Sequence, residues 1–162
     1  MDKRASRFFP ARFMVMAAVV IFGLTTPPVA HAQITIEGVW ATTATPRDCT
    51  TGAVLGPPVR ALVTFHQGGT VTQSVAELLA QPGQRSIGHG VWTQSGAAFI
   101  ERIATMTLFD SAIFQAGWTL STQTSTMTDA NNFSSLGDVV VYNLNRQPVR
   151  RLCLTRVGER FR

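Results

Sequence analysis

The amino-acid sequence predicts an all-β fold, an eight-stranded antiparallel up-and-down barrel, for residues 33–162. Short runs with two-residue alternation recur between Gly, Pro and Asn, whereas helical periodicity is nearly absent. Eight such runs are joined mostly by short turns, which is typical of an antiparallel meander. A closed meander would also bring together its first and last strands; Cys49 lies just past the first strand and Cys153 lies within the last. A two-sheet β-sandwich is the alternative, but closure alone removes the exposed strand edges.

The strands are expected at residues 34–43, 59–66, 70–75, 88–94, 97–109, 114–127, 133–144 and 148–157. Gly68-Gly69 predicts a tight hairpin turn, and the sequence Asp-Ala-Asn-Asn at 129–132 has turn chemistry. A Pro- and Gly-rich loop at 46–58 follows the first strand, and a longer connection at 76–87 contains Pro82 and Gly83. Within that connection, residues 77–80 could form one helical turn.

Residues 1–32 are set apart from this single domain because they have the pattern of a secretory signal peptide. A basic start is followed by the apolar run 13–24 and by the small-residue pattern Ala30-His31-Ala32. The apolar run has 12 residues, short of the roughly 20 that span a bilayer. We expect cleavage after Ala32, export to the periplasm or the extracellular space, and no membrane span in the mature chain.

The mature chain is only mildly basic. Residues 1–32 hold four of the 14 Lys and Arg residues and one of the nine Asp and Glu residues, which leaves a net charge of +2. The arginines near the C-terminus have Phe161 as the only aromatic residue among them: Arg146, Arg150, Arg151, Arg156, Arg160 and Arg162. Nucleic-acid binding favours basic stripes with interleaved aromatics, whereas charges on strands deter pairing between sheets. We therefore expect no nucleic-acid partner.

The two cysteines, Cys49 and Cys153, have only each other to pair with. An exported protein enters an oxidising compartment, so one disulfide is expected. No C-x-x-C pair is present, which favours a structural bridge over a redox site.

Gly38-Val39-Trp40, near the start of the first strand, resembles the G-x-W motif of the lipocalin and avidin group of barrels. In that group the Trp plugs the closed end of the barrel, and an Arg near the C-terminus packs across it. The resemblance implies that Trp40 is the floor of the barrel and that Arg156, or as second choice Arg160, lies over its ring. The segments 64–70 and 88–92 are also similar to hairpins of small secreted lipocalin-like barrels of bacteria.

The resemblance spans most of residues 36–160, with one departure. Lipocalins carry a helix after the last strand, and residues 158–162 leave no room for it. The size is closer to avidin-type barrels, but no biotin-site pattern is present, and we expect no biotin binding. What the resemblance implies is a barrel whose apolar cavity can hold a small molecule.

The candidate ligand-binding residues are four aromatic side chains and one charged pair: Trp92, Phe99, Trp118, Tyr142, Glu101 and Arg102. Glu101 and Arg102 are neighbours inside the long strand 97–109. Successive side chains of a strand point to opposite faces, so one of the two points inward unless a bulge or a rim position intervenes. A buried charge needs a partner, and it can orient a polar ligand.

The two histidines of the mature chain are expected to lie apart. His66 ends the second strand and His89 begins the fourth, so a meander places them at opposite ends of the third strand, ~20 Å apart at ~3.3 Å per residue. No further histidine or free thiol of the mature chain could complete a metal shell, and no metal site is expected. No G-x-S-x-G elbow or phosphate-binding glycine pattern is present, and no cofactor is expected.

These features favour an exported, non-enzymatic binding module for a small apolar or amphipathic molecule. A small barrel enzyme of the isomerase or cyclase type is the second hypothesis, with Glu101, Asp110 or His89 as its working group. A structural or protein-interaction role in the cell envelope is the third. The sparse titratable residues favour the first and third hypotheses over the second. Nothing in the sequence sets an oligomeric state.

Overall fold

The computed structural model describes residues 35–76, 85–109 and 114–162. The expected signal peptide, the expected helical turn at 77–80 and Asp110 lie outside the described residues. Within the described ranges, no helix has both the length and the apolar character needed to cross a membrane.

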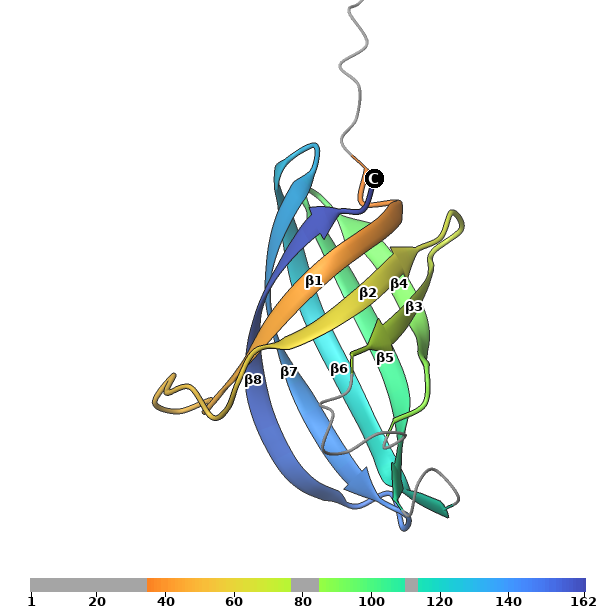
Figure 1. The fold of residues 1–162 in the computed structure, drawn as a ribbon, viewed down its shortest axis with the longest axis vertical. Helices are drawn as coiled ribbons and strands as arrows, with labels where there is room; N and C mark the ends of the chain where they lie inside the picture. The colour runs from red at the N-terminus through yellow and green to blue at the C-terminus, as the bar shows by residue number, and fades with distance from the viewer. Residues whose placement is uncertain (1–34, 77–84, 110–113) are drawn as a thin grey trace, which may run out of the picture. The chain divides into compact units, whose positions relative to one another are not determined.

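Eight antiparallel strands form a closed barrel in which each strand pairs with its neighbours in chain order (Figure 1). They are β1 (Gly38–Arg47), β2 (Val59–Phe65), β3 (Thr70–Val75), β4 (Gly88–Ser95), β5 (Ala98–Phe109), β6 (Phe114–Asp129), β7 (Asn132–Asn143) and β8 (Pro148–Arg160). β8 pairs with β1, from Trp40 opposite Arg160 to Arg47 opposite Cys153, and this pairing closes the sheet. The predicted eight-stranded antiparallel barrel is therefore confirmed, and the two-sheet sandwich is excluded.

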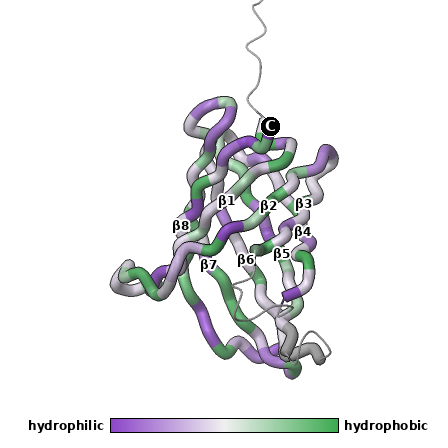
Figure 2. The backbone as a smooth tube through the Cα atoms, viewed as in Figure 1, coloured by the Kyte–Doolittle hydropathy of each residue, from purple (hydrophilic) through white to green (hydrophobic). Residues whose placement is uncertain are grey.

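Strand alternation divides each strand between the interior of the barrel and its outer surface. In β2, Ala61, Val63 and Phe65 are buried, whereas Arg60 and Leu62 are exposed. Hydrophobic and hydrophilic residues are accordingly mixed along the strands rather than separated into blocks (Figure 2). The buried hydrophobic core is Ile36, Trp40, Val63, Phe65, Val71, Phe99, Ile103 and Phe133. Because several of these residues lie where β1 begins and β2 ends, the core fills one end of the barrel.

The other end of the barrel is built mainly from the long strands. β2 and β3 have 7 and 6 residues, whereas β6 has 16 and β8 has 13. The strands β5 to β8 continue well past the ends of β2 and β3 (Figure 1). The barrel wall is therefore taller on the side of β5 to β8.

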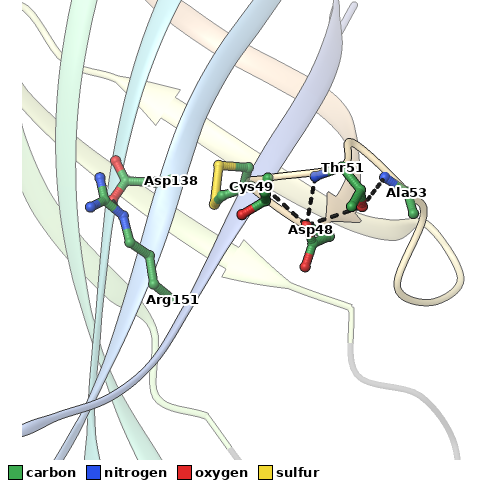
Figure 3. The surroundings of a disulfide bond; sticks show 8 residues. Asp48, Cys49, Thr51, Ala53, Asp138 and Arg151 are labelled. Carbon is green, nitrogen blue, oxygen red and sulfur yellow. Dashed lines mark hydrogen bonds and ion pairs between the residues drawn. A yellow bond between two sulfur atoms is a disulfide. The ribbon is translucent and has the colours of Figure 1, made fainter.

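The predicted disulfide between Cys49 and Cys153 is confirmed (Figure 3). Cys49 follows β1 and Cys153 lies in β8, so the bridge fastens the first strand to the last where the sheet closes. Beside it, Oδ1 of Asp48 accepts hydrogen bonds from the backbone N–H groups of Thr51 at 2.7 Å and Thr50 at 2.9 Å. These backbone donors, Thr51 first, lower the pKa of Asp48 from its ordinary value.

Candidate functional site

Packed aromatic rings close one end of the barrel. Trp40 is completely buried, and its Nε1 donates a hydrogen bond to the carbonyl oxygen of Ile36 at 2.7 Å. Its ring meets Phe133 edge to face with centroids 5.0 Å apart, and Phe133 meets Phe65 in the same manner at 6.3 Å. Edge-to-face pairs stabilise beyond the area they bury. This aromatic floor closes the end of the barrel near the C-terminus.

The arginine over the Trp40 ring is Arg160, and the first expectation, Arg156, is corrected. The guanidinium carbon of Arg160 lies 4.3 Å from the ring centroid of Trp40. Its three nitrogen atoms donate to backbone carbonyl oxygens of Thr35, Glu37 and Ala130. Residues four apart in a strand share a face, so the motif alone does not choose between the two arginines. The β1–β8 register decides, because it places Arg160 opposite Trp40.

Arg156 instead forms a buried polar layer next to the aromatic floor. Its guanidinium carbon lies 5.2 Å from the Phe133 centroid, and its Nη1 forms an ion pair with Oε1 of Glu101 at 2.6 Å. Its Nε and Nη2 donate hydrogen bonds to the Oγ atoms of Ser135 and Ser125. Arg156 is 3% exposed and Glu101 is 1% exposed, so each charge has its counter-charge inside the barrel.

Gly158 lies between the two arginines on β8 and makes room for the floor. A Cβ atom on this residue would overlap the ring of Phe133. The alternate positions Arg156, Gly158 and Arg160 thus place one guanidinium against Phe133 and the other against Trp40.

Farther from the floor, the lumen contains a cavity of about 300 Å³. Its apolar lining residues are Ala44, Pro46, Leu55, Val59, Ala61, Val75, Val139, Val141, Leu152 and Leu154. Its uncharged polar lining residues are Thr42, Gln73, Thr105, Thr119 and Ser121. The cavity therefore offers apolar surface with a group of hydroxyls on β5 and β6, a lining that suits a small amphipathic molecule.

Two arginines lie at the mouth of this cavity. Arg85 and Arg150 line it, and no Asp or Glu of the described residues does. Arg150 precedes Leu152 and Leu154 at the inward positions of β8 and lies opposite Val141 of β7. Both arginines are exposed, as is typical of arginines at the edge of an apolar cavity.

Two of the aromatic candidates, Trp92 and Phe99, belong to the closed end. Phe99 is part of the buried core, and Trp92 packs against it with centroids 6.1 Å apart. The Nε1 of Trp92 donates to the carbonyl oxygen of His66 at 3.0 Å, which fixes the ring beside the β2–β3 hairpin. Neither ring lines the cavity, and the expectation that they do is corrected.

The other two aromatic candidates, Trp118 and Tyr142, lie opposite each other on β6 and β7 and are half-buried. Their neighbours Thr119 and Val141 line the cavity. Because neighbouring side chains of a strand alternate, Trp118 and Tyr142 face the outer surface. The expectation that they line the cavity is likewise corrected.

Of the charged pair, Glu101 faces inward and Arg102 faces outward. β5 pairs with β6 without irregularity from Ala98 to Thr107, so no bulge intervenes. Glu101 lies in the polar layer, where Oε1 is held by the ion pair with Arg156 and neither carboxylate oxygen has a hydrogen-bond partner among the described residues. Arg102 is exposed on the outer face.

His66 and His89 flank the same residue, and the expected separation at opposite ends of the third strand is wrong. Nε2 of His66 lies 3.2 Å from Oγ1 of Thr72, and His89 is opposite Thr72 in the β3–β4 register. The reason is the register of β3 and β4: Gly88, the first residue of β4, pairs with Gln73 and not with Val75 at the end of β3. His89 therefore lies nearer to the middle of β3. Among the described residues, no three metal-ligating side chains gather into a site.

The residues proposed for an enzyme are not brought together in the part of the chain that the structure describes. Glu101 lies inside the barrel, whereas His89 is exposed on the outer face. Asp110, the third candidate, lies outside the described residues.

Sequence reasoning missed the residues that do line the cavity, most of which are Val, Leu, Thr or Ser. Once one residue of a strand is known to face inward, every second residue of that strand is expected to face inward as well, and this alternation identifies the lining residues. Starting from Glu101, it places Thr105 inward on the same strand.

The closed antiparallel barrel is consistent with the lipocalin-like fold that the G-x-W motif suggests. No protein-family model, no curated protein and no solved structure matches this chain. The lumen itself is therefore the feature of the barrel that indicates a function.

Proposed function

We propose that the mature chain is an exported, lipocalin-like binding protein that holds a small apolar or amphipathic molecule in the lumen of its barrel. The observation that carries this proposal is the cavity of about 300 Å³ inside the barrel. Its volume is at the lower end of the range of small-molecule sites in proteins. The aromatic floor blocks one end, so a ligand would enter and leave at the opposite end.

The lining supports an amphipathic ligand more than a fully polar one. Val139, Leu152 and Leu154 present methyl groups to the cavity, and burying an apolar ligand against them is favourable. Thr105 and Ser121 present hydroxyls that can donate to or accept from a polar group of the ligand.

Export is supported by two independent features. Residues 1–32 have the order of a cleaved secretory signal. The disulfide between Cys49 and Cys153 suits an oxidising compartment, where such bridges persist.

A fluorescence titration with the neutral apolar probe N-phenylnaphthylamine tests this function. Val139→Trp should fill part of the lumen and weaken binding of the probe at least about tenfold, because the bulky side chain occupies the space of the ligand. Val140→Trp is the matched control, since Val140 is the next residue on β7 and faces outward. The control should bind like the unmodified protein.

The protein for this titration is produced from the full-length precursor and collected after export. Its intact mass should correspond to a chain that begins at Gln33, with both cysteines oxidised. Absence of saturable probe binding, or equal loss in the two Trp variants, would overturn the lumen as the binding site. A mass that retains residues 13–24 would overturn the export proposal separately.

A further inference from the structure

We infer that the ligand is an amphipathic anion of medium length, with its head group at Arg150 and its apolar body in the lumen. The inference rests on the proposed binding function and goes further, because it assigns the charge of the ligand and its direction in the barrel. It is carried by the placement of Arg150, by the charges around the cavity and by the cavity volume.

Arg150 is the first inward-facing residue of β8, and the next two inward-facing residues are leucines. Leu152 and Leu154 follow it at alternate positions and line the same cavity. Val141, opposite Arg150 on β7, also lines the cavity. A ligand body in contact with these three apolar residues would therefore have its outer end within reach of the guanidinium.

Other arginines of the barrel are already engaged. Arg151 pairs with Asp138 at 3.1 Å on the outer face (Figure 3). Arg156 pairs with Glu101 in the polar layer. Arg160 donates to three backbone carbonyls at the floor. Among the described residues, Arg150 has no ion pair and no side-chain hydrogen bond, so its guanidinium is available to bind a carboxylate in bidentate fashion.

The charges around the cavity fix the direction of the ligand. At the inner end, the Glu101–Arg156 pair is neutral as a unit and offers no net positive charge to an anionic head group. At the mouth, Arg150 carries a positive charge, and no acidic residue of the described chain lines the cavity. An anionic head is therefore favoured at the mouth over the inner end.

The cavity volume limits the length of the body. About 300 Å³ corresponds to roughly ten water molecules at ~30 Å³ each. A saturated chain of about that many carbon atoms fills this volume, so decanoate is a suitable probe and long-chain lipids are too large to be enclosed.

Competition against bound N-phenylnaphthylamine tests the inference with decanoate, decanol and decyltrimethylammonium. These probes share the alkyl chain and differ in the charge of the head. Decanoate should bind about tenfold more tightly than decanol, because a hydrogen bond to a charged group is the added interaction, and the cation should bind most weakly. Arg150→Gln should weaken decanoate about tenfold and leave decanol unchanged. Arg151→Gln, the next residue on the outer face, should leave both unchanged.

Equal affinity for decanoate and decanol in the unmodified protein would overturn the inference while leaving the binding function in place. An equal effect of Arg150→Gln and Arg151→Gln on decanoate would also overturn it, because it would show a general effect of surface charge. If neither N-phenylnaphthylamine nor any decyl compound binds, the proposed function itself fails. The comparison of head groups needs no variant, so it stands even if a substitution alters folding.

Discussion

At the scale of single residues, the interior of the barrel is organised by two arginines that β8 presents four residues apart. Arg160 covers the Trp40 ring, and Arg156 contacts Phe133 and forms the ion pair with Glu101. Removing a partner from a buried pair is costly, because the remaining charge stays out of water without compensation. Glu101 is therefore a sensitive position for stability.

Glu101→Gln should lower the free energy of unfolding by about 3–5 kcal/mol, since Arg156 would retain a buried charge without a carboxylate. Arg102→Gln is the matched control, because Arg102 is the adjacent residue and is exposed on the outer face. It should change the free energy of unfolding by less than about 0.5 kcal/mol. Urea denaturation with the disulfide intact measures both changes, and similar losses in the two variants would show that the inward and outward assignments are wrong.

At the scale of strands, the pattern of Gly, Pro and Asn turns predicted all eight elements and their order. The boundaries agree within a few residues: the third strand is expected at 70–75 and found at Thr70–Val75, whereas the first is expected at 34–43 and found at Gly38–Arg47. Turn chemistry is local, so a single sequence carries it. The disulfide was predictable for a related reason, because the two cysteines could pair only with each other.

The faces of β6 were not predictable from hydropathy. On β6, Thr119, Ser121 and Gln123 face inward. Trp118 and Leu120 alternate with them along the strand and face outward. An apolar-inside assumption therefore selects the wrong face and takes Trp118 for a cavity residue. The β3–β4 register was also unpredictable, because a long connection leaves the offset between two strands free.

The β1–β8 pairing closes the barrel, and we call it the seam. The disulfide between Cys49 and Cys153 fastens this seam covalently. The disulfide joins residues 104 apart in sequence, and closing a loop of this size stabilises by up to ~4.7 kcal/mol in the chain-entropy model. The double variant Cys49→Ser with Cys153→Ser should therefore lower the free energy of unfolding by about 2–5 kcal/mol. Chemical denaturation measures this loss.

The reduced protein provides the control for that experiment and should be destabilised by a similar amount. Under native conditions the double variant should still bind N-phenylnaphthylamine, since the β1–β8 register extends from Trp40 to Arg47 without the bridge. Loss of probe binding in a folded double variant would show that the disulfide shapes the lumen as well as the seam.

At the scale of the whole barrel, the closed end and the lumen differ in character. The floor is aromatic and tightly packed, the next layer is a neutralised ion pair, and beyond it lies an open volume with Arg150 at its mouth. A barrel built only for stability would fill this volume with side chains, because empty space in a core is costly. The small residues Thr119 and Ser121 on the inner face of β6 instead leave this volume open, as the proposed binding function requires.

Intermolecular NOEs between bound N-phenylnaphthylamine and the protein methyl groups test the lumen as the binding site most directly. Binding in the lumen predicts NOEs from the ring protons of the probe to Val139, Leu152 and Leu154, which line the cavity. It predicts none to Leu120 and Val140, which alternate onto the outer face of the same wall. NOEs confined to Leu120 and Val140 would contradict it, because they would place the ligand outside the barrel.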